Sequence, residues 1–189
     1  MQHFYKNASF GENWFSFSRL YSDFVITVPN NSKIVEVGCW KGKSAAYMAV
    51  EIINSNKNID FYCVDTWEGS EEHQSDQYVQ NNSLYELFLS NIEPVKDIIK
   101  PIRKTSIEAS KDFEDNSLDL VFIDANHTYE AVKEDILHWL PKVKTNGIMA
   151  GHDYVHTTAW QGVIKAVNEV IGKENISQRE DCWVLWQKQ

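Results

Sequence analysis

The chain has 189 residues, 43% of them hydrophobic and 24% charged, which is typical of one globular domain with a short extension. A domain of this size buries enough surface to fold without disulfide bonds. The formal net charge of -9 argues against non-specific binding to nucleic acid or to an anionic membrane, because both require basic patches.

Cysteine usage and hydropathy give the expected compartment. Cys39, Cys63 and Cys182 form no CxxC pair, which predicts reduced thiols rather than a zinc site. Residues 1–21 are aromatic and do not read as a signal peptide, and no stretch approaches the ~20 apolar residues of a membrane span. We therefore expect a cytoplasmic protein.

Apolar runs and amphipathic stretches alternate along the chain after an aromatic N-terminal extension, residues 1–30. The predicted helices are 13–24, 43–54, 84–92, 107–113, 129–143 and 158–171, and the predicted strands are 33–37, 61–65, 98–103, 118–124, 148–150 and 182–186. Residues 66–80 are acidic and aperiodic, which predicts a functional or mobile loop, with His73 as a plain surface residue.

This alternation predicts an α/β domain, residues 31–189, with a mostly parallel sheet covered on both faces. Polar residues collect just after the strands, where the ligand crevice of such a sheet lies. They are Gly38, Asp65, Thr105, Asp124 and His152. We expect every candidate site to lie along this one edge.

The segment 36–44, Glu-Val-Gly-Cys-Trp-Lys-Gly-Lys-Ser, joins the first predicted strand to the following helix. Its glycines permit a tight turn and a close approach of the backbone to a ligand. A dinucleotide fingerprint requires glycine at position 40, which is Trp40, so that interpretation fails. A P-loop requires one more residue between Gly38 and Gly42, although Gly42-Lys43-Ser44 matches its end. The E/D-x-G-x-x-x-G-x-S loop of class I methyltransferases fits without adjustment, and a plain strand–helix turn is the remaining alternative.

An acid closes the second predicted strand. Asp65 follows Gly38 by 27 positions, near the offset of ~20 expected for a nucleoside binder. Its carboxylate can accept both hydroxyls of a ribose. Acids are common at strand ends, so this prediction depends on the glycine loop beside it.

Two carboxylates and two imidazoles follow the fourth and fifth predicted strands: Asp124, His127, His152 and Asp153. Oxygen and imidazole ligands can hold a divalent cation. Alternatively, His127 can take a proton from a substrate hydroxyl, because histidine titrates near neutrality. The structural alternative is that Asp124 and Asp153 cap the following helices.

With these motifs, the chain resembles the class I S-adenosylmethionine-dependent methyltransferases. Within them it is similar to a branch that includes macrolide and aminocoumarin sugar O-methyltransferases and proteins of glycan gene clusters. The matching stretches are 35–44, 64–69, 122–129 and 147–154. The resemblance implies a Rossmann-like, doubly wound, mostly parallel sheet of seven strands. It also implies S-adenosylmethionine as cofactor and O-methylation of a small-molecule or sugar hydroxyl.

The resemblance further implies which residues bind the cofactor. The glycine loop lines the methionine part, Asp65 binds the ribose, and residues 105–107 flank the adenine. The implied cofactor-binding residues are Glu36, Gly38, Gly42, Ser44, Asp65, Thr66, Trp67, Ser106, Ile107 and Asp124.

The branch binds magnesium through the aspartate after the fourth strand and an acidic pair after the fifth, and a histidine three residues after that aspartate acts as base. Asp124, Asp153 and His127 match, which makes His127 and Asp124 the predicted catalytic residues. His152 stands in place of the first acid of the pair. Imidazole suits magnesium poorly and manganese, iron or zinc better, so the predicted ligands Asp124, His152 and Asp153 leave the metal open between magnesium and manganese.

Two other functions stay open at this point: a P-loop nucleotide-binding protein, and a scaffold that binds the cofactor without catalysis. The expected partner is a small-molecule or sugar acceptor, with neither nucleic acid nor membrane, and a homo-oligomer is compatible with the sequence. We expect residues 66–80 and 1–24 to form the acceptor side, with Trp14 and Trp67 exposed there.

Overall fold

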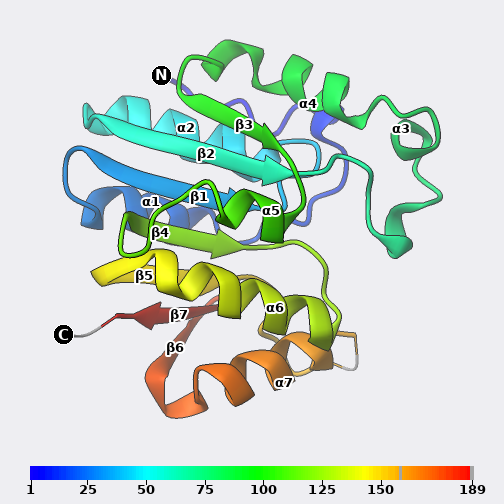
Figure 1. The fold of residues 1–189 in the computed structure, drawn as a ribbon. Helices are drawn as coiled ribbons and strands as arrows, with labels where there is room; N and C mark the ends of the chain where they lie inside the picture. The colour runs from blue at the N-terminus through cyan, green and yellow to red at the C-terminus, as the bar shows by residue number, and fades with distance from the viewer. Residues whose placement is uncertain (158, 188–189) are drawn as a thin grey trace.

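Seven strands form one sheet at the centre of the computed structural model, which describes residues 1–157 and 159–187 (Figure 1). The strands are β1 (Ser32–Val37), β2 (Ile59–Asp65), β3 (Ile99–Arg103), β4 (Leu118–Ile123), β5 (Val143–Gly151), β6 (Ile176–Arg179) and β7 (Cys182–Trp186). Their order is β3-β2-β1-β4-β5-β7-β6. The first five strands are parallel, and β7 runs antiparallel to β5 and β6. This arrangement confirms the predicted Rossmann-like fold class.

Helices cover both faces of the sheet. On one face lie α1 (Ser18–Thr27), α2 (Lys43–Ser55) and α4 (Leu84–Ile92), and on the other lie α5 (Ser106–Ser110), α6 (Tyr129–Trp139) and α7 (Gln161–Val170) (Figure 1). The remaining helical segments are α3 (Gln77–Gln80), η1 (Ala8–Phe10), η2 (Glu71–His73), η3 (Glu93–Val95), η4 (Leu140–Lys142) and η5 (Lys173–Asn175). Among the described residues, none of the helices is long and apolar enough to cross a membrane.

The central strands are buried on both sides, which explains their continuous apolar sequences. Ile34 of β1 joins the core under α1 and α2, whereas its neighbour Val35 joins the core under α6 and α7. Every residue of β4 is buried. Parallel strands covered on both faces require such sequences, because neither side of the strand meets water.

The N-terminal segment belongs to the same core as the sheet. Phe17 and Tyr21 contact Phe122 of β4, with ring centroids 4.8 and 4.9 Å apart. Both side chains are at most 1% exposed. The predicted helix 13–24 is real but begins at Ser18 and ends at Thr27.

The structure corrects several predicted boundaries. The helix predicted over 129–143 ends at Trp139, because Pro141 lacks an amide hydrogen and lies in a 3-10 turn. The following strand β5 consequently begins at Val143 instead of 148. Strand β6 was not predicted, since it has four residues and none is fully buried. The helix predicted from 158 is seen from Gln161, and Thr158 lies outside the described residues.

Candidate functional site

The glycine loop between β1 and α2 packs tightly against its own chain. Gly38 and Gly42 have φ angles of 88° and 85°, a region that glycine adopts without strain. A Cβ atom on Gly38 would lie 2.0 Å from the carbonyl oxygen of Asp124, and one on Gly42 would lie 2.9 Å from the ring of Phe88. Both glycines are therefore required by packing against β4 and α4, whatever they contribute to ligand binding.

Glu36, the second-last residue of β1, is 1% exposed and carries a carboxylate that is only half satisfied. Ser44 donates a hydrogen bond to its Oε1, while Oε2 and the nearby hydroxyl of Tyr21 have no hydrogen-bond partner among the described residues. Burial raises the pKa of Glu36 to about 8, against the weaker opposing effect of Ser44. A buried carboxylate with a free oxygen fits a cationic group, such as the amino group of a bound methionine moiety.

Asp65 ties the glycine loop to the end of β2. Its Oδ2 accepts the backbone N–H groups of Cys39 and Trp40 at 2.8 and 2.9 Å, and its Oδ1 accepts the N–H of Trp67 at 2.7 Å. A carboxylate oxygen can accept two hydrogen bonds, so Oδ1 retains one acceptor position. Ribose binding by Asp65 stays a prediction, and the structure adds a role in holding the loop.

The expectation that Trp67 is exposed is wrong. Its side chain is 2% exposed and packs between Tyr85 and Phe88, with ring centroids 4.7 and 4.6 Å away. Its indole N–H donates to the carbonyl of Trp40 at 3.0 Å. Trp67 has a φ of 54° in this inward placement. The adjoining Thr66 is half-buried at the end of β2.

Ser106 and Ile107 begin α5, next to the end of β3. The Ser106 hydroxyl donates to Asp135 and accepts the indole N–H of Trp139 at 2.9 Å, so this side chain serves the contact between α5 and α6. Thr105 caps the helix by accepting the N–H of Glu108. Ile107 is partly exposed at the sheet edge, where its side chain remains free to line an adenine site.

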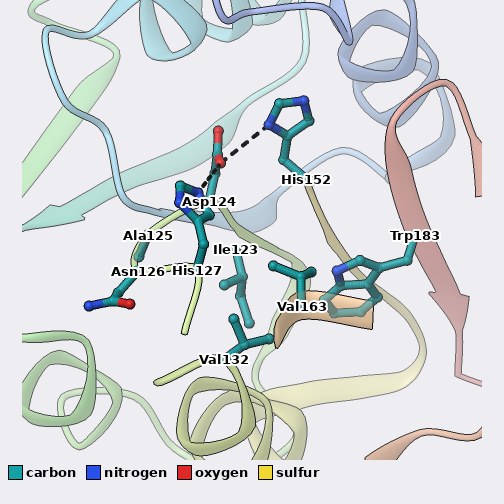
Figure 2. Close-up of a pocket in the computed structure, with 9 residues that line it drawn as sticks. All are labelled: Ile123, Asp124, Ala125, Asn126, His127, Val132, His152, Val163 and Trp183. Atoms are coloured by element: carbon teal, nitrogen blue, oxygen red, sulfur yellow. Dashed lines mark ion pairs between the residues drawn. The ribbon is translucent and has the colours of Figure 1, made fainter. Parts of the chain in front are cut away.

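Four polar side chains meet where β4 and β5 end. These strands are neighbours, and Figure 2 shows Asp124, His127 and His152 pointing toward one another. His127 Nε2 lies 2.9 Å from Asp153 Oδ2 and 3.8 Å from Asp124 Oδ1, and His152 Nδ1 lies 3.4 Å from both of those oxygens. The structure thus brings together the four residues that the sequence placed at adjacent strand ends.

The capping alternative for the two aspartates is wrong. Thr128 caps α6 through its side chain, and the residue before α7 is Trp160. Asp153 is instead held at a φ of 58° and is 7% exposed. A residue other than glycine with such a positive φ is strained by about 1–3 kcal/mol, and strain of this kind is concentrated at functional sites.

The cluster is electrostatically balanced. Burial alone lowers the pKa values of His127 and His152, but the carboxylates of Asp124 and Asp153 outweigh it and raise both to about 10. In return, the two imidazoles outweigh burial and hold the pKa values of both carboxyls below their usual range. Two imidazolium and two carboxylate groups therefore neutralise one another near pH 7.

The same donors fit a divalent cation. One ligand atom each from Asp124, His152 and Asp153 lies within 4.8 Å of the other two. His127 Nε2 is buried and makes no properly aligned hydrogen bond among the described residues, despite its closeness to Asp153. Two carboxylate oxygens and one imidazole nitrogen form a donor set that manganese, iron or zinc accepts more readily than magnesium.

The loop 66–80 and the N-terminal segment both reach this cluster, and their role as the acceptor side stays a prediction. Glu72 contacts His127 Nδ1 at 3.0 Å. His73 is half-buried, with its ring 4.3 Å from Trp40 and 5.5 Å from Trp14, so the prediction of a plain surface residue is wrong. Trp14 is 53% exposed, as predicted.

Sequence reasoning missed several of these residues. Glu72 and Ser16 carry no motif, and Ser16 contacts His152 Nε2 at 3.2 Å across 136 positions of the chain. Their only signal was that they lie in the two aromatic or aperiodic segments assigned to the acceptor side. Trp40 lies in the glycine loop, where the sequence assigned it no contact with His73. A cavity of about 190 Å³ opens nearby, lined by Arg19, Leu20, Arg179 and Glu180.

Comparison with known proteins decides the family. The profile of a family described as a methyltransferase domain matches residues 35–154, from β1 to the residue after Asp153. The chain belongs to this family. The match includes the glycine loop, Asp65 and the four-residue cluster, and it confirms the resemblance to class I methyltransferases.

One curated relative matches part of the chain and carries no assigned activity. An uncharacterized protein from Sinorhizobium fredii, y4gI, is 30% identical over 121 residues, which are 64% of this chain and 13% of that protein. The chain thus spans about an eighth of the length of this curated relative.

Solved structures share the fold at low identity. The O-methyltransferase NovP has a TM-score of 0.64 at 18% identity, covering 91% of this chain and 78% of that one. CalS11, a TDP-rhamnose 3'-O-methyltransferase of calicheamicin biosynthesis, has a TM-score of 0.62 at 16% identity, covering 91% and 77%. The Podospora anserina methyltransferase PaMTH1, solved with S-adenosylhomocysteine bound, has a TM-score of 0.58 at 17% identity, covering 84% and 72%.

Proposed function

We propose that this methyltransferase domain binds S-adenosylmethionine and transfers its methyl group to a hydroxyl oxygen of a small-molecule or sugar acceptor. The observation that carries the proposal is the convergence of Asp124, His127, His152 and Asp153 at the strand ends beside the glycine loop. An acid–base cluster at this place is what transfer to a hydroxyl requires, because the acceptor must lose its proton.

The contacts of Lys43 argue against the P-loop alternative. In a P-loop the lysine reaches toward the bound phosphates. Here its Nζ atom donates to the carbonyls of Glu12 and Gly11, at 2.8 and 3.5 Å, in the N-terminal segment. With the lysine turned away and the loop one residue short, the free Oε2 of Glu36 supports a cationic amino acid moiety rather than a triphosphate.

The hydrogen bond from His127 to Glu72 selects the nitrogen that acts as base. An ionised carboxylate only accepts, so Glu72 keeps the proton on Nδ1 and leaves Nε2 to take the proton of the acceptor hydroxyl. Nε2 faces Asp124 and Asp153, whose negative charges raise the pKa of His127 to about 10. Without a compensating positive charge, the ring therefore stays protonated near pH 7 and cannot accept a further proton. A divalent cation held by Asp124, His152 and Asp153 would offset that negative charge and polarise the acceptor hydroxyl.

The acceptor side offers an aromatic face and a free guanidinium. Trp14 is exposed beside Trp40 and His73, and Arg19 makes no hydrogen bond or ion pair among the described residues, whereas Arg179 pairs with Asp23. CalS11 acts on TDP-rhamnose, a sugar that carries a diphosphate. An acceptor that combines a ring hydroxyl with an anionic group fits the same features in this chain.

Calorimetry with S-adenosylmethionine and with ATP tests the cofactor, and a methyl-transfer assay with phosphorylated and neutral sugars tests the reaction. We expect binding of S-adenosylmethionine alone, and release of S-adenosylhomocysteine that depends on an acceptor and on His127. Binding of ATP alone would favour the P-loop function. Cofactor binding without turnover on any hydroxyl acceptor, with or without Mn²⁺, would favour a scaffold.

A further inference from the structure

Two segments far apart in the sequence meet at the outer nitrogen of His152. Ser16, just before α1, places its hydroxyl oxygen 3.2 Å from His152 Nε2 and 3.1 Å from Asp181 Oδ2, in the turn between β6 and β7. These contacts span 136 and 165 positions of the chain. The family match ends at residue 154 and begins at 35, so Ser16 and Asp181 both lie outside it.

The direction of each hydrogen bond follows from the donors available. The ionised Asp181 carboxylate can only accept, so the single proton of the Ser16 hydroxyl points to it. The Ser16 oxygen must then accept from His152, which requires a proton on Nε2. A metal ligand must be a neutral imidazole, which carries one proton, so in that form the lone pair is left on Nδ1.

That lone pair faces the carboxylates. Nδ1 of His152 lies 3.4 Å from oxygens of Asp124 and Asp153, and all three residues offer ligand atoms within 4.8 Å. The ring of Phe17 packs 4.7 Å from the imidazole, which restricts its rotation. A metal-binding histidine usually has its other N–H held by such an outer hydrogen bond, which fixes the tautomer and the ring orientation.

We infer that Ser16 and Asp181 are positioning residues that fix His152 as the nitrogen ligand of a divalent cation at Asp124 and Asp153. The inference rests on the cation site of the proposed function. The resulting set of two oxygens and one nitrogen takes a transition metal such as Mn²⁺ in preference to Mg²⁺. The N-terminal segment and the β6–β7 turn thereby become part of the metal site without touching the metal.

Binding of Mn²⁺ to protein freed of metal by a chelator tests this inference, measured by calorimetry and by the loss of the free Mn²⁺ electron paramagnetic resonance signal. We expect S16A and D181A to weaken Mn²⁺ binding about 10- to 100-fold, the usual effect of removing an outer hydrogen bond at a metal site. S16T keeps the hydroxyl and should bind Mn²⁺ with an affinity near that of the wild type. S9A and D115A change exposed residues away from the cluster and should leave it unchanged.

A second readout is the tautomer of His152, followed by nitrogen chemical shifts of the imidazole in the metal-free protein above the pH at which the ring loses its charge. We expect the Nε2–H form in the wild type and a mixture of forms in S16A. Unchanged Mn²⁺ affinity in both S16A and D181A, or a tighter site for Mg²⁺ than for Mn²⁺ in the wild type, would overturn the inference.

The outcome is separable from that of the proposed function. Binding of S-adenosylmethionine by calorimetry does not require the cation site. If S16A and D181A leave Mn²⁺ binding unchanged while cofactor binding and turnover are intact, the methyltransferase proposal still stands. Loss of cofactor binding in the wild type overturns the proposed function, whatever Mn²⁺ does.

Discussion

The ends of β1 and β2 use their polar groups differently from the ends of β4 and β5. At the first pair, Asp65 accepts three backbone N–H groups and Ser44 donates to the side chain of Glu36, so both acids hold the loop in place. At the second pair, Asp124 and Asp153 face two imidazoles instead. The first region therefore joins ligand binding to the folding of the loop, whereas the second holds titratable groups whose charges balance one another.

The largest effect that separates the two regions is expected for His127→Ala. Removing a general base typically lowers the rate about 100- to 10,000-fold, and His127 lies outside the cofactor loop. Turnover should fall by that factor while calorimetry shows unchanged affinity for S-adenosylmethionine. H138A removes an exposed histidine of α6 and serves as the control. Near-normal turnover of H127A would contradict the assignment of the base.

Gly38→Ala should act in the opposite way, on folding and on cofactor binding together. The new Cβ would meet the Asp124 carbonyl at 2.0 Å, in addition to the strain of a positive φ. We expect a loss of at least about 1–3 kcal/mol in the free energy of unfolding, measured with urea.

Gly11→Ala is the matched control for this substitution. It has a φ of 71°, but its nearest neighbour is the flexible end of Lys41 at 3.4 Å. Equal losses of stability in both variants would show that the close approach to β4 does not matter.

Asp65→Ala tests whether that carboxylate serves the ribose as well as the loop. Loss of a charge-assisted hydrogen bond costs about 1.5–3 kcal/mol, or roughly tenfold to a hundredfold in affinity for S-adenosylmethionine. D60A, on the same strand and exposed, should change neither affinity nor stability. A D65A protein that is less stable but binds the cofactor with unchanged affinity would leave Asp65 with the structural role alone.

The smallest effects are expected in the pH dependence of stability, and they fall in different windows. Burial raises the pKa of Glu36 from 4.5 to about 8, so the folded state binds more protons there and stability falls as pH rises through that range. The pKa values of His127 and His152 are raised from 6.5 to about 10, so their stabilising contribution is complete below 6.5 and is lost toward 10.

The two windows overlap between 6.5 and about 8, so urea unfolding of metal-free protein compares the slope below pH 6.5 with the slope above pH 8. Glu36→Gln should flatten the lower window, and the double variant H127Q/H152Q should flatten the upper one. An unchanged slope above pH 8 in the double variant would show that the imidazoles do not carry this dependence.

The sequence predicted the parts of the fold that depend on local pattern. Continuous apolar runs identified β1, β2 and β4, because strands covered on both faces exclude polar residues. The same reasoning failed where the pattern is too short, as in β6, and where Pro141 moved the start of β5. The adjacency of Asp124 and Asp153 followed from strand order, since parallel strands end at one edge.

Side-chain direction was decided by the tertiary structure alone. Trp67 and His73 lie in one loop, but the first is buried against α4 and the second stacks on Trp40. Nothing in the local sequence distinguishes them, because the burial of each depends on helices and loops that pack from elsewhere in the chain.

The sequence by itself determined the fold class, the glycine loop and the four residues of the acid–base cluster, because each depends on strand order and on the few residues that follow a strand. Only the tertiary structure placed Ser16 between His152 and Asp181, and Glu72 on His127. These contacts join segments between 55 and 165 positions apart, and they depend on where the N-terminal segment, the loop 66–80 and the β6–β7 turn settle on the sheet. Hydrogen bonds of that range leave no periodic trace in a sequence, yet the proposed roles of both imidazoles depend on them.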